Sequence, residues 1–427
     1  MHPRATPIAR RTLASLAGIA GLTLLAGCSQ SRSAQADADA QNAATPATQT
    51  ATDDQRQYDP YAHSATNLSG SATIAAAQDP WAQDANRANA MDVYRRAFNS
   101  EVPAGLSDYN PPESYNINQI TTTDVGSDFD PDIAADGSFV VFASTQHHPS
   151  ADIYLKRADR NVITQLTSDS GHDVMPAVSP DGTRVAFASN RSGNWDIYVV
   201  SLDGAKPILI TSDSAHELHP SWSPDGSRLV YSRLGTNSGR WELWVTNVDN
   251  PAKRSFVGYG LFPEWNPVAG TGDNGADRIV FQRSRERNDR SFGVWTIDFA
   301  DDRSSNPTLI ASSGDQALIN PTWSPDGQFV VYASVPNPTE WAEGDQYARP
   351  GTADLRMVDA WGRGNISLTE GNSVDIMPTW GPGNRLYFVS NRGGQENLWS
   401  MDTAPAVLAA RNEIRGGNSA TASVPTD

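Results

Sequence analysis

The sequence predicts an all-β fold, a six-bladed β-propeller, and its repeats carry this prediction. A proline-anchored motif, seen as PSWSPDG at 220–226 and PTWSPDG at 321–327, recurs through the chain. An apolar strand and then a third strand follow each copy. The aligned prolines are Pro131, Pro176, Pro220, Pro263, Pro321 and Pro378, separated by 43 to 58 residues. Four antiparallel strands in about 44 residues, repeated radially, are typical of a propeller blade.

Each strand of the repeat can be located by its pattern. An apolar residue stands two positions after each proline: Ile133, Val178, Trp222, Trp265, Trp323 and Trp380. Second strands are expected at 139–144, 184–189, 228–233, 278–283, 329–334 and 385–390, and third strands at 152–156, 196–200, 242–246, 293–297, 354–358 and 397–401. In SPDG, proline fixes the first turn position and glycine accepts a left-handed conformation, so this segment predicts a hairpin turn.

The fourth strands indicate how the ring closes. They are expected at 162–167, 207–211, 253–257, 307–311 and 365–369, but the last repeat has none. A spare copy, INQIT at 117–121, precedes the first repeat. Pairing of this strand with the last blade would close the ring and leave no open edge between first and last blades. We therefore predict a propeller over 115–402, closed by an N-terminal strand.

The N-terminal residues have the layout of a secretory signal. Arginines precede an apolar run at 13–26, which is shorter than a membrane-spanning helix requires. The run ends in LAGC, with the only cysteine of the protein at Cys28, and this sequence resembles the bacterial lipobox. We expect residues 1–27 to be a lipoprotein signal peptide and Cys28 to be lipidated; an ordinary signal followed by an incidental cysteine is the alternative. The resemblance implies export to the cell envelope and anchoring in the outer membrane, facing the periplasm.

Three further segments flank the predicted propeller. Residues 28–78 are mostly Ala, Gln, Thr, Ser and Asp, which predicts a lipidated, low-complexity flexible linker. Residues 79–114 are interpreted as an amphipathic helix, over 79–100, and a connector. The apolar stripe of this helix either docks on the propeller or receives a partner. Residues 403–427 are expected to form a C-terminal tail.

Composition and missing motifs limit the possible functions. Lys and Arg number 32 against 49 Asp and Glu, giving a net charge of −17, so nucleic acid and bare anionic membrane are poor partners. The sequence contains no G-x-S-x-G, H-E-x-x-H or C-x-x-C motif. We therefore predict a monomer that is not an enzyme, with no catalytic residues, no cofactor and no metal.

A polar residue recurs three positions before the proline. Four of these six positions are acidic: Asp128, Asp173, Glu217 and Asp375. We expect these acids to ring one mouth of the channel, together with His219 and with Trp341 and Tyr347 of the insertion at 335–353. An acidic mouth beside aromatic loops suits a cationic or extended peptide. Alternatively, the acids only solvate a loop, or His172, His216 and His219 with Asp173 and Glu217 hold a metal ion.

At this point the repeats resemble a known family. The pattern PxWSPDG, then an apolar strand, SNR, DIY and LT resembles the WD-like repeats of TolB-type six-bladed propellers, most clearly at 172–211, 215–257 and 374–402. The resemblance covers about 115–402 and implies noncatalytic binding of envelope proteins or peptides, including a peptidoglycan-associated lipoprotein. An α/β domain precedes the propeller in that family, and here an anchor and linker replace it. The same repeat also occurs in lyases and peptidase propellers. The alternatives are a metal-dependent lactonase or polysaccharide lyase with its site in the channel, and a purely structural spacer.

Overall fold

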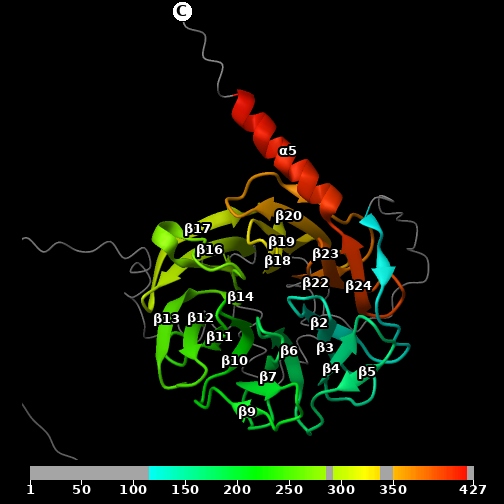
Figure 1. The fold of residues 1–427 in the computed structure, drawn as a ribbon, viewed down its shortest axis with the longest axis vertical. Helices are drawn as coiled ribbons and strands as arrows, with labels where there is room; N and C mark the ends of the chain where they lie inside the picture. Colours follow the sequence, from blue (N-terminus) through cyan, green and yellow to red (C-terminus); the bar gives the residue numbers. More distant parts are fainter. Residues whose placement is uncertain (1–114, 285–291, 337–349, 421–427) are drawn as a thin grey trace, which may run out of the picture. The chain divides into compact units, whose positions relative to one another are not determined.

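The protein forms a six-bladed β-propeller, as the sequence predicts. The computed structural model describes residues 115–284, 292–336 and 350–420. Six four-stranded antiparallel sheets are arranged in a ring and are followed by a C-terminal helix (Figure 1). We number the blades 1 to 6 in the chain order of their innermost strands.

The strands of each blade run outward from the channel in sequence order. The innermost strands are β2 (Asp128–Ile133), β6 (Asp173–Val178), β10 (Glu217–Trp222), β14 (Leu261–Trp265), β18 (Gln316–Trp323) and β22 (Asp375–Trp380). The second strands are β3 (Phe139–Ser144), β7 (Arg184–Ser189), β11 (Arg228–Leu234), β15 (Asp277–Ser284), β19 (Phe329–Pro336) and β23 (Arg385–Ser390). The third strands are β4 (Asp152–Arg157), β8 (Asp196–Ser201), β12 (Trp241–Asn247), β16 (Phe292–Ala300), β20 (Asp354–Asp359) and β24 (Asn397–Asp402). The outer strands of blades 1 to 5 are β5 (Ile163–Gln165), β9 (Ile208–Leu209), β13 (Arg254–Tyr259), β17 (Arg303–Ala311) and β21 (Ile366–Ser367).

The ring closes through the predicted N-terminal strand. β1 (Asn118–Gln119) pairs antiparallel with β24 and supplies the outer strand of blade 6. Just beyond it, the Thr121 hydroxyl accepts a hydrogen bond from the Leu398 amide at 3.0 Å. Segments from opposite ends of the propeller therefore share one sheet, which ties blade 6 to the residues that lead into blade 1.

Tryptophans after the repeat prolines fill the spaces between blades. Trp222, Trp265, Trp323 and Trp380 are all buried. The Trp222 indole donates to the Ala177 carbonyl of blade 2 at 2.9 Å, and the Trp323 indole donates to the Glu264 carbonyl of blade 4 at 3.1 Å. A buried tryptophan removes a large apolar area from water while its N–H still needs a partner, so each of these two bonds fixes the position of a neighbouring blade.

The SPDG segments are hairpin turns, as expected. In blade 3 the Asp225 carboxylate accepts bonds from the Ser223 hydroxyl at 2.6 Å and the Ser227 amide at 3.1 Å. Gly226 has φ of 68°, in the left-handed region where glycine carries no steric cost. The repeat that dominates the sequence is therefore a turn signal.

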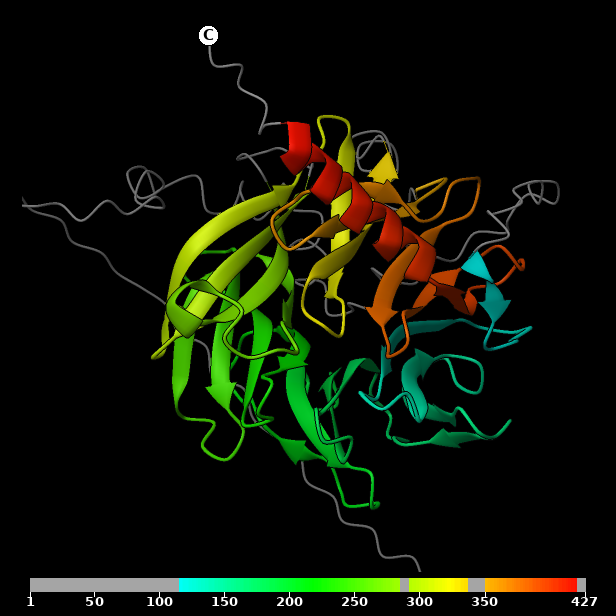
Figure 2. The same ribbon diagram turned by 45° about the horizontal axis from the view of Figure 1, so that its top comes forward.

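The C-terminal residues differ from the expected tail. Residues 404–420 form helix α5 (Ala404–Ala420) instead. The Asp402 carboxylate accepts a bond from the Ala404 amide at 2.9 Å at the start of this helix. Ala406, Val407 and Ala410 are buried at helical spacing, and Arg411 contacts Asp326 of blade 5 at 3.2 Å. Figure 2 shows the helix alongside this part of the ring. The apolar spacing of 406–410 is a helix signal that the strand repeat obscures.

Several predictions concern residues outside this description. The signal peptide, Cys28, the linker and the 79–100 helix lie outside the described residues, as do Trp341 and Tyr347. Across the described ranges, no helix combines the length and the apolar character needed to cross a membrane.

Candidate functional site: the central channel

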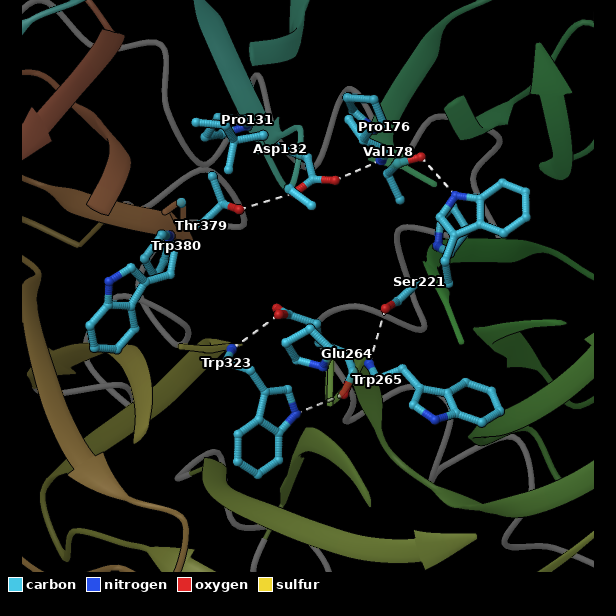
Figure 3. A pocket seen from close by; sticks show the side chains of 18 of the residues that line it. Pro131, Asp132, Pro176, Val178, Ser221, Glu264, Trp265, Trp323, Thr379 and Trp380 are labelled. Carbon is cyan, nitrogen blue, oxygen red and sulfur yellow. Dashed lines mark hydrogen bonds between the residues drawn. The ribbon is translucent and has the colours of Figure 1, made fainter. Parts of the chain in front are cut away.

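A cavity of about 520 Å³ occupies the channel and is lined by the same segment of all six blades. In each blade this segment runs from the residue before the repeat proline to the start of the following turn. Figure 3 shows side chains from opposite blades facing this shared space. A concave site built on rigid strands around the ring is a typical location for ligand binding.

The residue before the repeat proline has a left-handed backbone in every blade. The six residues, with φ between 49° and 54°, are Asp130, Met175, His219, Phe262, Asn320 and Met377. A register shift interrupts the pairing of each innermost strand with its neighbour at this point. Such bulges redirect side chains, and a left-handed non-glycine residue costs about 1–2 kcal/mol. All six residues line the cavity, so the bulge places a different side chain there from each blade.

The residue after the proline forms a second layer that joins blades around the channel. The six residues are Asp132, Ala177, Ser221, Glu264, Thr322 and Thr379. The Asp132 carboxylate accepts bonds from the Val178 amide of blade 2 at 2.6 Å and from the Thr379 hydroxyl of blade 6 at 3.0 Å. Asp132 therefore links three blades at the channel wall (Figure 3).

Glu264 plays the equivalent part on another side of the ring. Its Oε1 atom accepts bonds from the Trp323 amide at 3.0 Å and the Thr322 hydroxyl at 3.1 Å, both in blade 5. The Ser221 hydroxyl accepts the Trp265 amide at 3.0 Å and so joins blades 3 and 4. These bonds orient the carboxyl groups before any ligand arrives, which lowers the entropic cost of binding.

The carboxyl groups of the cavity have raised pKa values. Burial raises the pKa of Asp130 to about 7, of Asp132 to about 6 and of Glu264 to about 8. For Glu264 the nearby Asp132 charge adds to the effect. These three groups therefore exchange protons close to neutral pH, and a cation entering the cavity would favour their charged forms.

The described lining of the cavity includes neither lysine nor arginine. Its histidine, His219, has its pKa lowered to about 3 by burial and is therefore neutral at physiological pH. The His219 ring lies 3.6 Å from the Phe262 ring, centroid to centroid. The site thus combines three carboxyl groups, prolines and aromatic rings, a chemistry that suits an ammonium or guanidinium group on an apolar chain.

The four predicted mouth acids lie elsewhere, at the start of their innermost strands. Their exposed fractions are 1% for Asp128, 0% for Asp173, 0% for Glu217 and 2% for Asp375. Arg191 binds Asp173 at 2.8 Å, Arg392 binds Asp375 at 2.6 Å, and Arg233 lies 3.5 Å from Glu217. These buried side chains therefore do not ring an open mouth as expected, and in three of the four an arginine beside the acid offsets the cost of burying its charge.

The histidines before the prolines have structural contacts. The His172 Nδ1 atom accepts the Ala151 amide at 3.1 Å, and the His216 Nδ1 atom accepts the Trp195 amide at 3.3 Å. Each bond crosses to the preceding blade. Among the described residues, no group of three or more His, Cys, Asp or Glu side chains is placed to hold a metal ion.

Sequence reasoning missed the two carboxyl groups that join the blades. His219 was predicted and lines the cavity, whereas Asp132 and Glu264 were not singled out. Their signal was available in the strand pattern. Successive side chains of a strand point to opposite faces, so the residue after each proline lies on the face opposite to the buried residue that follows it. It was overlooked because acids occupy this position in only two of the six blades.

The blade architecture and channel are those of a six-bladed propeller. The family model described as the TolB beta propeller domain matches residues 114–259, and the predicted resemblance is confirmed.

Solved structures with a similar fold include two TolB proteins and a lyase. A putative TolB from Agrobacterium tumefaciens is 19% identical, with 64% of this chain and 90% of that chain covered and a TM-score of 0.47. TolB from Acinetobacter baumannii is 15% identical, with 64% and 65% covered and a TM-score of 0.44. An oligogalacturonate lyase from Vibrio parahaemolyticus is 13% identical, with 68% and 97% covered and a TM-score of 0.45. These likenesses concern the fold alone.

Proposed function

We propose that this protein is a lipid-anchored propeller of the cell envelope that binds a protein or peptide partner without catalysis. The partner is an envelope protein, such as a peptidoglycan-associated lipoprotein, and it contributes a cationic or extended segment. The observation that carries this proposal is the channel cavity of about 520 Å³, with three carboxyl groups and no described lysine or arginine in its lining.

The fixed geometry of the cavity supports binding by an inserted side chain. Asp132 and Glu264 are each held by two hydrogen bonds from neighbouring residues of the ring. Because these groups are already oriented, a lysine, an arginine or an N-terminal amine would meet acceptors that need little rearrangement. Proline and tryptophan side chains around them would cover the apolar part of the segment.

The residues predicted from the sequence have different parts in this proposal. His219 belongs to the cavity, and partner contacts by Trp341 and Tyr347 stay predictions about loops outside the described residues. The buried acids Asp128, Asp173, Glu217 and Asp375 would act as supports for the strands rather than as exposed contacts.

Site-directed photocrosslinking in intact cells tests the proposal. A photoreactive residue at Ala135, which is exposed at the cavity lining, should give a discrete protein adduct. The same residue at Thr308, exposed on the outer strand of blade 4, is the matched control and should give none. The Ala135 adduct should weaken at least tenfold when Asp132→Asn and Glu264→Gln are combined. An adduct that is equally strong from both positions, or indifferent to the two substitutions, would contradict binding in the channel.

The anchor requires its own experiment. Cys28→Ser should move the protein from the membrane fraction to the soluble fraction and abolish incorporation of labelled fatty acid, because lipid would attach to this sulfur. Retention of the label in Cys28→Ser would overturn lipidation at Cys28 while leaving the channel proposal intact.

One observation favours the enzymatic alternative. Three carboxyl groups that exchange protons near neutral pH lie in one cavity, and such groups are suited to general acid–base catalysis. A polysaccharide lyase or lactonase of this kind should turn over polyuronate or lactone substrates, and Glu264→Gln should abolish the turnover. Adding divalent cations to the purified protein shows whether any activity depends on a metal.

A further inference from the structure

Blades 2 and 6 each contain an acid–arginine pair at the start of the innermost strand. In blade 2 the Arg191 guanidinium donates to both oxygens of Asp173 at 2.8 Å and to the Ser189 hydroxyl at 2.8 Å. In blade 6 Arg392 donates to Asp375 at 2.6 Å and to the Ser390 hydroxyl at 2.9 Å. The same carboxylate, serine and arginine therefore recur in two blades.

Two aromatic rings support each of these arginines. The Arg191 guanidinium carbon lies 5.3 Å from the Phe187 ring centroid and 4.7 Å from that of Tyr198. In blade 6 the corresponding distances from Arg392 are 5.2 Å to Phe388 and 5.4 Å to Trp399. A guanidinium group is bound favourably by a carboxylate that accepts its hydrogen bonds and by aromatic rings on which it stacks, and both are present in these two blades.

Blade 1 keeps every part of this site except the arginine. Asp128 pairs in register with Ser144, as Asp173 pairs with Ser189. Phe142 and Tyr154 pair across β3 and β4 as Phe187 and Tyr198 do in blade 2, and their rings stack at 6.1 Å.

Gln146 occupies the position of the missing arginine. The backbone N–H of Gln146 donates to the Ser144 hydroxyl at 3.2 Å. The backbone N–H groups of Arg191 and Arg392 donate to the hydroxyls of Ser189 and Ser390 at 3.3 Å and 3.2 Å. The backbone N–H at this position thus makes the same bond in all three blades, where the side chain is glutamine in blade 1 and arginine in blades 2 and 6.

Among the described residues, no arginine or lysine forms an ion pair with the Asp128 carboxylate. Its Oδ1 atom has no hydrogen-bond partner, and the residue is 1% exposed. Burial is the largest influence on its pKa and raises it, against the lowering effect of the Ser144 and Thr121 hydroxyls and of His147. His147, in the exposed loop after β3, has its ring 5.7 Å from the Tyr154 ring and is the nearest substitute for the arginine.

The charges around Asp128 also suit a ligand that carries a single positive charge. At the junction of blades 1 and 2, Asp169 shares Arg191 with Asp173, and the charge of Asp152 lies near both acids. At the junction of blades 6 and 1 the position equivalent to Asp152 is Asn397, which accepts the Thr123 amide at 2.7 Å. The acid that the previous blade supplies at the junction of blades 1 and 2 is therefore replaced by a neutral amide here, so the charge of one guanidinium suits the buried Asp128 carboxylate.

We propose that Asp128, Phe142 and Tyr154 form a binding site for an arginine side chain of a partner protein, which enters where blades 2 and 6 carry their own arginine. The exposed His147 side chain moves aside as the guanidinium stacks on Tyr154 and bonds to Asp128 Oδ1. These three residues do not line the channel cavity, so this site is separate from the one described above.

Titration of the full-length protein with a capped Gly-Arg-Gly peptide tests this site. The peptide should bind, and its citrulline counterpart, which is neutral and nearly the same shape, should bind at least tenfold more weakly. Gln146→Arg should abolish binding, because the blade would then fill the site with its own side chain. The same variant should unfold at a higher temperature than the wild type, which shows that it folds and that the new arginine is bound.

A second variant makes the test independent of Gln146. Arg191→Gln recreates the blade 1 arrangement in blade 2 and should add a second peptide site, whereas His147→Ala should tighten binding at the first. Equal binding by wild type and Gln146→Arg would overturn the inference, as would equal binding of the citrulline peptide or binding of calcium or manganese in preference to arginine. A wild type that gives the Ala135 crosslink but binds no arginine peptide would refute this site and leave the channel proposal standing.

Discussion

Two positions of the repeat, one on each side of the proline, carry acids that have different roles. The acid three residues before the proline recurs in four blades and is fully enclosed. The residue after the proline varies from blade to blade and lines the channel cavity in five of them, where its acids are Asp132 and Glu264. The recurring position supports its own blade, since in blades 2 and 6 the buried acid binds an arginine of the same blade. At the varying position, one blade can carry a different side chain from the others without disrupting the fold. This position is therefore better suited to recognise a partner.

The strongest test of this comparison is loss of a recurring acid. Asp173→Ala should lower the free energy of unfolding by about 3 kcal/mol, because it leaves the Arg191 charge without its buried partner. Glu264→Gln, an isosteric change in the channel, keeps an acceptor oxygen and should cost less than about 1 kcal/mol. Urea denaturation of both variants measures this difference. Equal losses would mean that the two positions share one structural role.

A smaller difference is expected between two recurring acids. Asp375→Asn loses its charged bond to Arg392 and should destabilise the protein by about 2 kcal/mol. Asp128→Asn removes a buried charge that has no described arginine partner, so its free energy of unfolding should change by less than about 1 kcal/mol. Thermal and urea unfolding of the two variants compare them directly. A larger loss in Asp128→Asn would show that another cation already satisfies Asp128.

The channel acids should make stability depend on pH. Burial raises the pKa of Glu264 from 4.5 to about 8, so the folded protein keeps a proton that the unfolded chain releases above about 4.5. Because the unfolded state then binds fewer protons, stability should fall as the pH rises from 4.5 towards 8. Asp132 contributes in the same direction up to about pH 6. Glu264→Gln should show a shallower decline in urea midpoint over this range, and an unchanged slope would exclude a buried, protonated Glu264.

The smallest effect is expected at the edge of the ring. Arg411 and Asp326 form an ion pair at 3.2 Å between α5 and blade 5, but their side chains are 45% and 44% exposed. Solvent screens such pairs, so Arg411→Ala should change the free energy of unfolding by about 0.5 kcal/mol or less. A loss as large as that of Asp173→Ala would show that the helix, and not the blade contacts, holds the ring together.

Local patterns predicted nearly all of the strand architecture. The SPDG turns, the strand order and the closing strand at 117–121 follow from turn chemistry and from alternation of apolar residues, which act over a few neighbouring residues. Helix α5 was missed because its short apolar spacing stands beside a dominant strand repeat. The extent of β17, Arg303–Ala311, exceeds the expected 307–311, because pairing with the long β16 extends it.

The site was less predictable, as the acids show. Repetition marks Asp173 and Asp375 as important, but it cannot say whether a side chain faces solvent or an arginine. Asp173 and Arg191 are 18 residues apart and meet only because two strands pair in register. The missing arginine of blade 1 is visible as Gln146 in the sequence only after that pairing is known.

The sequence by itself determined the blade number, the turns and the closure of the ring, because each depends on local backbone preferences repeated in order. Tertiary structure alone decided which polar residues are enclosed and which face the channel. Asp132 and Glu264 become a site because the closed ring brings residues 132 positions apart along the chain to one cavity and binds them to neighbouring blades. Burial and the charges of neighbouring blades, which no single repeat contains, then set their pKa values and their chemistry.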